Sequence, residues 1–475
     1  MHNKMEVMKF KTFKGGIFPP EYKEMSKDSA IEKIFPTTKL VSIPVTQGGA
    51  PNQPVVNVGD HVLRGQVIAK NDAFMSAPVH ASVTGTVKKI EVRPLAANQE
   101  GPCITIQMDE DESAQEQVSF MPPLDPFTCT KQEALARVKE AGIVGMGGAA
   151  FPTHVKLNPP PGKVVDCVLA NAAECEPYLT IDYRTMKETP ELLVDGLAIV
   201  VHITGAQTGI IALEDNKIDL LPVLVDAIEK AGFSDKLEVC VVKTKYPQGG
   251  EKSLVKAVLN REIPSGGLPA DAGCVISNVG SLCAISEAFR LGKPLIDRGF
   301  TISGGAVEEP KNLKVPIGTI VSELMPSVFN TKADLVKILS GGPMMGFACA
   351  NANFPVVKNT SGVTFLTEKE ADISEEGQCI GCGKCIGVCP MRLTPVMIVR
   401  ELKADNIDGA KKFGLMDCIE CGSCAFNCPA RVKFVQRFRL GKGVVRAQMM
   451  AAKAKADAEK AKAEAAKAEA KKEDK

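Results

Sequence analysis

The chain carries two dense cysteine motifs near its C-terminal end. Residues 379–390 read CIGCGKCIGVCP, and residues 418–429 read CIECGSCAFNCP. In each motif three cysteines stand three residues apart, and a fourth follows four residues later, directly before a proline. Thiolate sulfur is a preferred ligand of soft transition metals, so cysteines repeated at a fixed short spacing predict metal coordination.

The spacing C-x2-C-x2-C-x3-C-P is that of bacterial two-cluster ferredoxins. Three closely spaced cysteines wrap one [4Fe–4S] cube, while the fourth begins a helix that leads to the other cube. We therefore predict that one cluster takes Cys379, Cys382, Cys385 and Cys428, and the other takes Cys418, Cys421, Cys424 and Cys389. The competing interpretation is a pair of zinc ribbons, although zinc usually takes two C-x2-C pairs without a third cysteine at the same interval.

Composition places these motifs in an otherwise ordinary globular protein. The chain has 475 residues, 16 cysteines and a formal net charge of +1. Its first residues contain no apolar stretch, so we expect no secretory signal, a reducing compartment and free thiols. No run of 18 uninterrupted apolar residues occurs, so we expect no transmembrane segment. Neutral charge, no Trp and four Tyr argue against nucleic acid as a partner.

A glycine-rich segment forms a second candidate site. Residues 142–157, GIVGMGGAAFPTHVKL, follow a helical stretch at 131–141. Its glycines let the backbone approach a phosphate closely, with bare N–H groups as donors. A helix C-cap followed by a plain loop is the competing interpretation, because glycine commonly ends helices.

Three further segments place polar residues just after expected strands, where open α/β sheets bind ligands. Two of the expected strands are VVDCVLAN and LEVCVVKTK. The third ends at residues 277–278, where an expected helix begins. For each carboxylate in these segments, a solvated loop position is the competing interpretation. The polar and glycine residues that follow the strands are Asn171, Glu174, Glu176, Tyr246, Gly249, Glu251, Asn278 and Ser281.

The segments GMGGAAFPTHVKL, NAAECEP, YPQGGEK and SNVGS, in this order, resemble the FMN- and NADH-binding core of the flavoprotein subunit of respiratory complex I. Together with TFKGGIFPPEYK near the start and the double cysteine motif, they resemble the RnfC family of the Rnf complexes. These complexes are membrane-bound ferredoxin:NAD oxidoreductases that translocate Na+ or H+. The resemblance covers residues 12–429.

The resemblance implies roles for individual residues of the central segments. It implies that FMN is held by Gly145, Gly147, Gly148, Lys156, Asn171, Asn278 and Ser281. It also implies that Phe151, Glu174, Glu176 and Glu251 line the NAD(H) side, with Glu176 and Glu251 as the catalytic pair, and that Tyr246 and Gly249 lie at the flavin edge. Complex I-type segments usually have Arg at position 146 and acids at 173 and 250, where this chain has Met146, Ala173 and Gly250.

The fold class that we expect is multidomain α/β plus β. The expected parts are an N-terminal extension (1–40), a barrel-sandwich hybrid domain (41–120), an α/β FMN/NADH-binding core (121–292), a β-grasp module of the SLBB type (293–365), an α-helical two-cluster ferredoxin-type domain (366–446) and an Ala/Lys-rich tail (447–475). Within the β-grasp module, KADLVKILS (332–340) predicts a short helix. The last 25 residues predict a solvated, partly helical tail.

The resemblance also implies a function. The chain would be a peripheral subunit on the cytoplasmic face of the cell membrane that passes electrons between two [4Fe–4S] clusters, FMN and NAD(H). Its partners would be integral-membrane and ferredoxin-like subunits of the complex, and ferredoxin indirectly. The alternatives are a soluble cobalamin reductase, in which the sandwich module follows the clusters, and an electron-transfer subunit without flavin.

Overall fold

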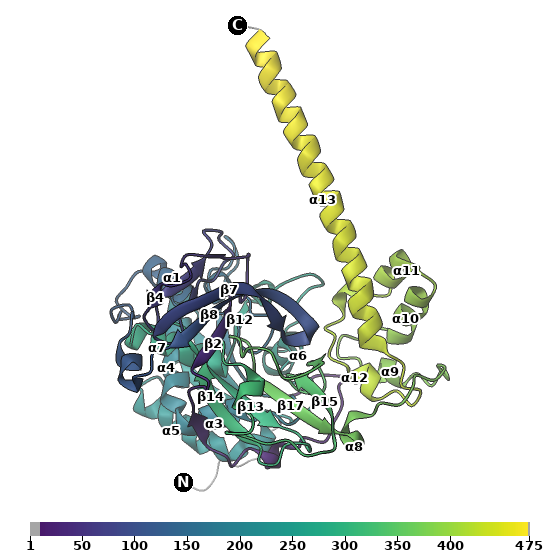
Figure 1. The fold of residues 1–475 in the computed structure, drawn as a ribbon. Coiled ribbons are helices and arrows are strands. Elements are labelled where there is room, and N and C mark those ends of the chain that lie inside the picture. The colour runs from purple at the N-terminus through teal and green to yellow at the C-terminus, as the bar shows by residue number, and fades with distance from the viewer. Residues whose placement is uncertain (1–9, 474–475) are drawn as a thin grey trace. The chain divides into compact units, whose positions relative to one another are not determined.

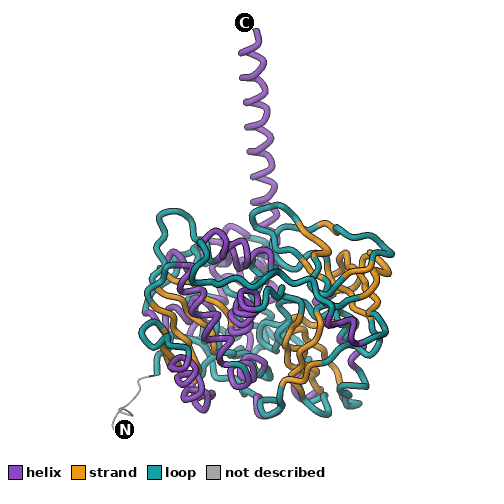
Figure 2. The backbone as a smooth tube through the Cα atoms, turned by 90° about the vertical axis from the view of Figure 1, so that its left-hand side faces the viewer, coloured by secondary structure: helices purple, strands orange, loops and turns teal. Residues whose placement is uncertain are grey.

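A computed structural model describes residues 10–473, and these divide into two compact units. The first unit comprises residues 10–14 and 18–373, and the second comprises residues 15–17 and 374–473. Strands in several separate groups, with helices gathered beside some of them, make up the fold (Figure 2). No helix of the described residues is both long enough and apolar enough to cross a membrane.

A four-stranded parallel sheet lies at the centre of the α/β core, in the order β11–β10–β9–β12. Its strands are rich in Val, Ile and Leu, as expected for parallel strands that are covered on both faces. The sheet confirms the three strands predicted from sequence. The strands are β9 (Cys167–Ala172), β10 (Thr208–Glu214), β11 (Leu237–Val242) and β12 (Cys274–Asn278), and the helices of this core are α1 (Lys131–Glu140), α2 (Thr153–Lys156), α3 (Ile181–Glu188), α4 (Pro190–Thr204), α5 (Leu221–Lys230), α6 (Glu251–Leu259) and α7 (Val279–Arg290).

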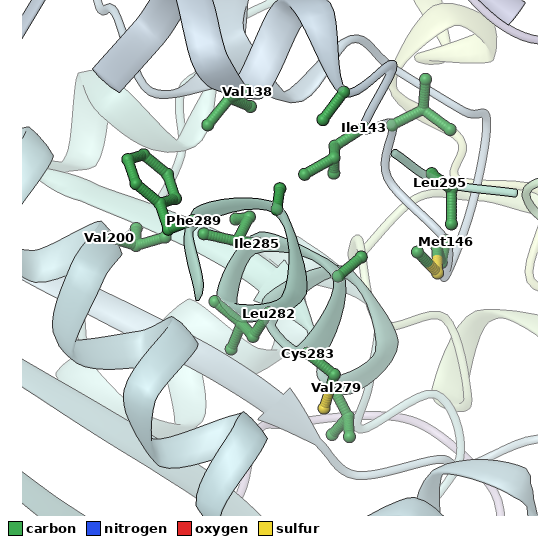
Figure 3. Packing of buried hydrophobic residues seen from close by; sticks show 14 of the residues in the cluster. Val138, Ile143, Met146, Val200, Val279, Leu282, Cys283, Ile285, Phe289 and Leu295 are labelled. Atoms are coloured by element: carbon green, nitrogen blue, oxygen red, sulfur yellow. The ribbon is translucent and has the colours of Figure 1, made fainter. Parts of the chain in front are cut away.

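Helix α7 is the packing centre of this core. Leu282, Ile285 and Phe289 of α7 point into a cluster that also contains Val138 of α1 and Val200 of α4 (Figure 3). All five side chains are fully buried. Burial of this kind fixes the helix axis, and with it the position of the helix N-terminus at the carboxyl end of β12.

Two antiparallel sheets form the barrel-sandwich region. One has the order β2–β8–β7–β4 and the other β3–β5–β6. Their strands are β2 (Leu40–Pro44), β3 (Gln53–Pro54), β4 (His61–Val62), β5 (Val67–Lys70), β6 (Val79–His80), β7 (Gly85–Leu95) and β8 (Gln99–Met108).

A mixed six-stranded sheet forms the β-grasp region, in the order β1–β14–β13–β17–β15–β16. Figure 1 labels four of these strands, β14, β13, β17 and β15. Its strands are β1 (Ile31–Lys33), β13 (Asp297–Ser303), β14 (Lys311–Pro316), β15 (Leu335–Ser340), β16 (Phe347–Cys349) and β17 (Gly362–Thr367), and the short helix α8 (Glu368–Ala371) follows. The predicted helix over 332–340 is wrong, because this segment forms β15. Antiparallel pairing with both β16 and β17 satisfies its backbone groups and overrides the weak helical spacing of its apolar residues.

The second unit is helical around the cysteine loops. Its apolar core contains Ile398, Leu415, Phe434 and Phe438. Residues 15–17 belong to this unit, in which the Gly16 N–H donates to the Val388 carbonyl at 2.8 Å. The helices are α9 (Lys384–Gly387), α10 (Pro395–Lys403), α11 (Ile407–Lys412), α12 (Ser423–Phe426) and α13 (Phe434–Glu473).

Helix α13 continues far beyond the other helices of the second unit and includes most of the predicted helical tail (Figure 1). Residues 474–475 of the predicted tail lie outside the described residues. The basic stretch at the start of α13 is partly paired within the unit, since Arg437 contacts Glu376, and Arg439 and Lys442 contact Glu420.

Candidate functional site

The cysteines of the second unit line two separate cavities. One cavity, of about 490 Å³, is lined by all four cysteines predicted for the first cluster, and the other, of about 380 Å³, by all four predicted for the second. Each cavity therefore receives three cysteines from one motif and the last cysteine of the other motif. The sets are Cys379, Cys382, Cys385 and Cys428 in one cavity, and Cys389, Cys418, Cys421 and Cys424 in the other.

Each cavity offers four thiols, the number that a [4Fe–4S] cube takes from cysteine. A tetrahedral zinc ion, with Zn–S distances of about 2.3 Å, would draw four sulfurs close together. Among the residues that the structure describes, no group of three or more His, Cys, Asp or Glu converges closely enough to hold one metal ion.

The surroundings of the two cysteine sets differ. Cys379 and Cys382 are exposed, whereas Cys421 and Cys424 are buried. Near the second set, the Glu420 N–H donates to Cys418 Sγ at 3.3 Å. Burial raises the pKa of the Cys418 thiol to about 11, so this thiol has to lose its proton when it binds metal.

Residues near Cys418 also form a charged network. Lys442, which is buried, donates to the Cys418 carbonyl and to Glu420 Oε1 at 2.8 Å. Glu420 also accepts a bond of 3.1 Å from Arg439. These charges lie beside one cysteine set only, although the two motifs have the same spacing.

The glycine-rich loop of the first unit joins the N-terminus of α7. The Gly145 N–H donates to the Phe151 carbonyl at 2.9 Å and closes the loop. A Cβ on Gly147 would lie 3.2 Å from the Asn278 side chain, whereas no described atom lies within 4 Å of a Cβ on Gly148. The loop therefore packs against Asn278 and leaves open space beside Gly148.

Asn278 and Ser281 attach this loop to α7. Asn278 caps the helix, since its Oδ1 accepts the Gly280 N–H at 2.9 Å. Ser281 Oγ accepts the Met146 N–H at 3.0 Å and donates to the Val144 carbonyl at 3.2 Å. A helix N-terminus beside a loop of small residues is a favourable place for a phosphate.

Predicted site residues meet in two further pairs at the carboxyl ends of the parallel strands. Lys156 Nζ lies 3.1 Å from Glu251 Oε1 and donates to the Ile276 carbonyl at 2.9 Å. Asn171 Nδ2 donates to the Gly249 carbonyl at 2.8 Å. The structure thus brings residues from four separate segments to one edge of the sheet.

Glu174 and Glu176 make backbone contacts that the sequence did not predict. Glu174 accepts the N–H groups of Asp182 and Tyr183 at 2.7 and 3.3 Å and so caps α3. Glu176 accepts the N–H groups of Met344 and Met345, in the β-grasp region, at 3.1 and 2.8 Å. Burial raises the pKa of each carboxylate to about 7. Their contact with a dinucleotide stays a prediction.

Tyr246 lines a different cavity, of about 600 Å³, at the carboxyl ends of β10 and β11. Cys175 also lines it, and its Sγ accepts the Gly249 N–H at 3.3 Å. This bond links the acidic loop after β9 to the loop after β11. The remaining lining residues are Phe18, Pro19, Glu21, Lys23, Pro177, Glu214, Asp215, Asn216, Lys243, Thr244 and Lys245.

Sequence reasoning missed two buried lysines that hold the acidic loop. Lys23 Nζ donates to the Leu179 and Glu176 carbonyls at 2.6 and 3.1 Å. Lys217 Nζ donates to the Ala173 carbonyl at 2.6 Å. Lys23 lies within TFKGGIFPPEYK, a segment noted only for its resemblance, and Lys217 carries no sequence signal.

Two observations of the pocket fit a bound flavin nucleotide. The open space at Gly148 lies in a loop that borders a helix N-terminus, as a phosphate requires. Gln248, in the loop before α6, is fully buried, and neither of its side-chain polar atoms has a hydrogen-bond partner within the described part of the chain. A buried amide without partners indicates that a further polar group belongs nearby.

Four protein-family models match the chain. They are the RnfC barrel sandwich hybrid domain over residues 11–111, the Nuo51 FMN-binding domain over 138–287, the SLBB domain over 300–348 and the 4Fe-4S dicluster domain over 371–462. These matches confirm the predicted fold class and the predicted cofactors, FMN and two [4Fe–4S] clusters.

Curated relatives extend over nearly the whole chain. The RnfC protein of the proton-translocating ferredoxin:NAD(+) oxidoreductase complex of Clostridium ljungdahlii is 46% identical over 94% of this chain and 96% of its own length. The RnfC protein of the Na(+)-translocating ferredoxin:NAD(+) oxidoreductase complex of Acetobacterium woodii is 41% identical over 93% and 98%. The chain belongs to the RnfC family of ion-translocating ferredoxin:NAD(+) oxidoreductase complexes. A third RnfC protein, from Rhodobacter capsulatus, is 40% identical over 91% of this chain and 83% of its own length.

A solved structure is also similar, but more distantly. An NAD+-reducing [NiFe]-hydrogenase in the air-oxidized state aligns with 66% of this chain and 63% of its own, at 18% identity and a TM-score of 0.48. That likeness is too weak to inform the sites of this RnfC protein.

Proposed function

We propose that this RnfC protein is the NAD(H)-reactive part of its complex and passes electrons between two [4Fe–4S] clusters, FMN and NAD(H). The observation that carries the proposal is that one chain holds two four-cysteine cavities and a glycine-rich loop joined to the N-terminus of α7. When bound, FMN supplies the exchange between hydride transfer and single-electron transfer that such a chain needs.

The residues of the pocket bind the flavin and orient it. N–H groups of the glycine-rich loop and of the first turn of α7 hold the phosphate, together with Lys156. Asn171 and Gly249, which are bonded to each other, border the flavin ring. Tyr246, which lines the cavity at the carboxyl ends of β10 and β11, lies at the flavin edge in this proposal. Glu251 holds Lys156 in place through their ion pair of 3.1 Å. The remaining residues assigned to this site are Gly145, Gly147, Gly148, Phe151, Glu174, Glu176, Asn278 and Ser281.

Partners follow from the names of the relatives, each of which is one component of a multi-subunit complex. We propose that the partners of this chain are integral-membrane and ferredoxin-like subunits, and that ferredoxin reaches it through them. The chain would then lie peripherally on the cytoplasmic face of the membrane. The predicted domain boundaries are part of the same proposal.

Anaerobic purification of the full chain tests this function. We expect about eight iron and eight sulfide per chain, one FMN, and bleaching of both chromophores by NADH. FMN content is measured after acid release from the protein, and cluster reduction is followed by electron paramagnetic resonance.

Two results would contradict the proposal in different ways. Clusters without flavin and without a response to NADH would favour an electron-transfer protein that lacks the flavin step. Flavin without clusters would contradict the assignment of both cysteine sets. Co-purification with multi-span membrane proteins separates a member of a membrane complex from a soluble reductase.

A further inference from the structure

The β-grasp region contacts the glycine-rich loop through hydrogen bonds. Three of its side chains donate to carbonyls within that loop. Lys358 Nζ donates to the Gly142 carbonyl at 2.7 Å, and Asn359 Nδ2 donates to the Gly148 carbonyl at 2.8 Å. The third side chain is Arg298 of β13, which binds at the middle of the loop.

Arg298 is fixed beneath residue 146. Its side chain is buried, with only 4% of the residue exposed. Its Nη1 lies 2.7 Å from Met146 Sδ, its Nη2 donates to the Met146 carbonyl at 3.3 Å, and its Nε donates to the Thr360 carbonyl. The guanidinium is therefore positioned by the strand and by the loop together.

These contacts orient the N–H groups of the loop. In a trans peptide the C=O and N–H bonds point in opposite directions. Because the Met146 carbonyl faces Arg298, the N–H of Gly147 points away from Arg298. Because the Gly148 carbonyl faces Asn359, the N–H of Ala149 points away from Asn359. Both N–H groups are thus turned from the β-grasp side chains.

Arg298 also supplies a cation beside the glycines of the loop, in addition to Lys156 farther along the same segment. Residues 142–151 contain no charged side chain. A Cβ on Gly280, in the first turn of α7, would lie 3.0 Å from Arg298 Nη1, so the guanidinium lies beside the helix N-terminus. Burial lowers the pKa of Arg298 only to about 10, so the group is cationic at neutral pH.

The acidic group nearest to this charge is already partly engaged. Asp182 Oδ2 accepts the Asn278 Nδ2–H at 2.7 Å, and burial raises the pKa of Asp182. Asp182 offsets part of the Arg298 charge. The partial positive charge of the helix N-terminus adds to what remains, so the local potential is positive. A dianion complements that potential better than a neutral molecule does.

We propose that Arg298 is a positioning residue that makes the flavin site selective for the phosphorylated flavin. It acts through the glycine-rich loop, which it orients, and through its charge, which favours the phosphate. This inference rests on the proposed flavin function. It adds that a strand outside the FMN-binding core sets which flavin is bound.

A pair of matched variants in the full chain tests it. Arg298→Gln and Arg298→Lys both shorten the side chain and keep hydrogen-bond donors, but only the lysine keeps the charge. Affinities for FMN and for riboflavin are measured on flavin-free protein by fluorescence quenching. We expect Arg298→Gln to weaken FMN binding by about tenfold or more and riboflavin binding by less than about threefold. Arg298→Lys should keep most of the preference for FMN.

Arg64→Gln provides a control. Arg64 Nη2 lies 2.7 Å from Oδ1 of Asp297, which is the neighbour of Arg298 on β13. This control should leave the ratio of the two affinities unchanged. Equal weakening of FMN and riboflavin by Arg298→Gln would overturn the inference, and so would loss of the FMN preference in Arg298→Lys. If the unaltered chain bound neither flavin, the proposed function itself would fail.

Discussion

The cysteine cavities and the glycine-rich pocket are built in opposite ways. Each cavity draws its cysteines from two short motifs within residues 379–428, so the spacing along the chain fixes most of its lining cysteines. The pocket draws its residues from segments spread over residues 142–281. Its supporting contacts reach from Lys23 to Lys358.

This difference determines where a substitution acts. If each cysteine that lines a cavity is a cluster ligand, as we propose, no neighbour can replace it. In the pocket several predicted residues contact other segments through backbone groups, as Glu176 does with the N–H groups of Met344 and Met345. We therefore expect substitutions in the cavities to abolish cluster binding, and substitutions in the pocket to weaken flavin binding by degrees.

The largest expected effect is on iron content, because each cluster is proposed to take three cysteines from one motif and one from the other. Cys389→Ser combined with Cys421→Ser removes two ligands of the same cluster, so about four of eight iron atoms should remain. Cys389→Ser combined with Cys379→Ser removes a ligand from each cluster, so almost no iron should remain. Iron and sulfide are measured after anaerobic purification.

Cys349→Ser, in β16 of the first unit, serves as the control and should keep all the iron. The reverse pattern, with about four iron atoms in the Cys389/Cys379 variant and almost none in the Cys389/Cys421 variant, would mean that each motif binds its own cluster.

Gly148→Ala tests the open space in the pocket. The added methyl group meets no described atom, so the melting temperature of the flavin-free chain should not fall. If FMN occupies this space, its dissociation constant should rise by about tenfold. Titration calorimetry with FMN measures the change.

Gly443→Ala, in α13, is the matched control, since its Cβ also meets no described atom and lies in the second unit. Unchanged FMN affinity in Gly148→Ala would place the phosphate elsewhere.

Glu176→Gln should change how stability depends on pH. Burial raises the pKa of Glu176 from 4.5 to about 7. Between these pH values the folded chain keeps the proton that the unfolded chain releases. The contribution of Glu176 to the free energy of unfolding is therefore complete below pH 4.5 and is lost as the pH rises to about 7. The variant has no such group, so its melting temperature should fall less over this range.

Glu174, whose pKa is raised in the same direction, is present in both proteins, so the difference between them reports Glu176 alone. The exposed Glu308→Gln is the control and should follow the unaltered chain. Parallel curves for Glu176→Gln and the unaltered chain would show that Glu176 ionises normally.

The smallest expected effect separates the two cysteine sets. Lys442 is buried beside Cys418, whereas Lys384 is exposed beside Cys385. A nearby cation stabilises the reduced cluster, which carries more negative charge. Lys442→Met should therefore lower the midpoint potential of the cluster at Cys418 by tens of millivolts. Lys384→Met should change the other potential less, because water screens an exposed charge.

Equal shifts in the two variants, measured by redox titration with electron paramagnetic resonance, would mean that burial does not distinguish the two sites. The motifs would then set both potentials.

Much of the fold could be predicted because its signals are local. The buried strands β9 and β11, the helix α1 and the strand-to-helix junction at Asn278 follow from apolar runs and turn residues in the sequence. The segment 332–340 failed because its apolar spacing fits a helix, while its neighbours β16 and β17 offer backbone partners that only the folded sheet provides.

The sequence by itself predicted the four cysteines that line each cavity and the position of the glycine-rich loop, because these features depend mostly on spacing within a few residues. Only the tertiary structure decided that Arg298 lies under Met146, 152 residues away along the chain. It also decided that Glu174 caps α3 and that Glu176 is held by the β-grasp region. A residue's type shows which bonds it can make, whereas its partners depend on which distant segments folding brings within reach.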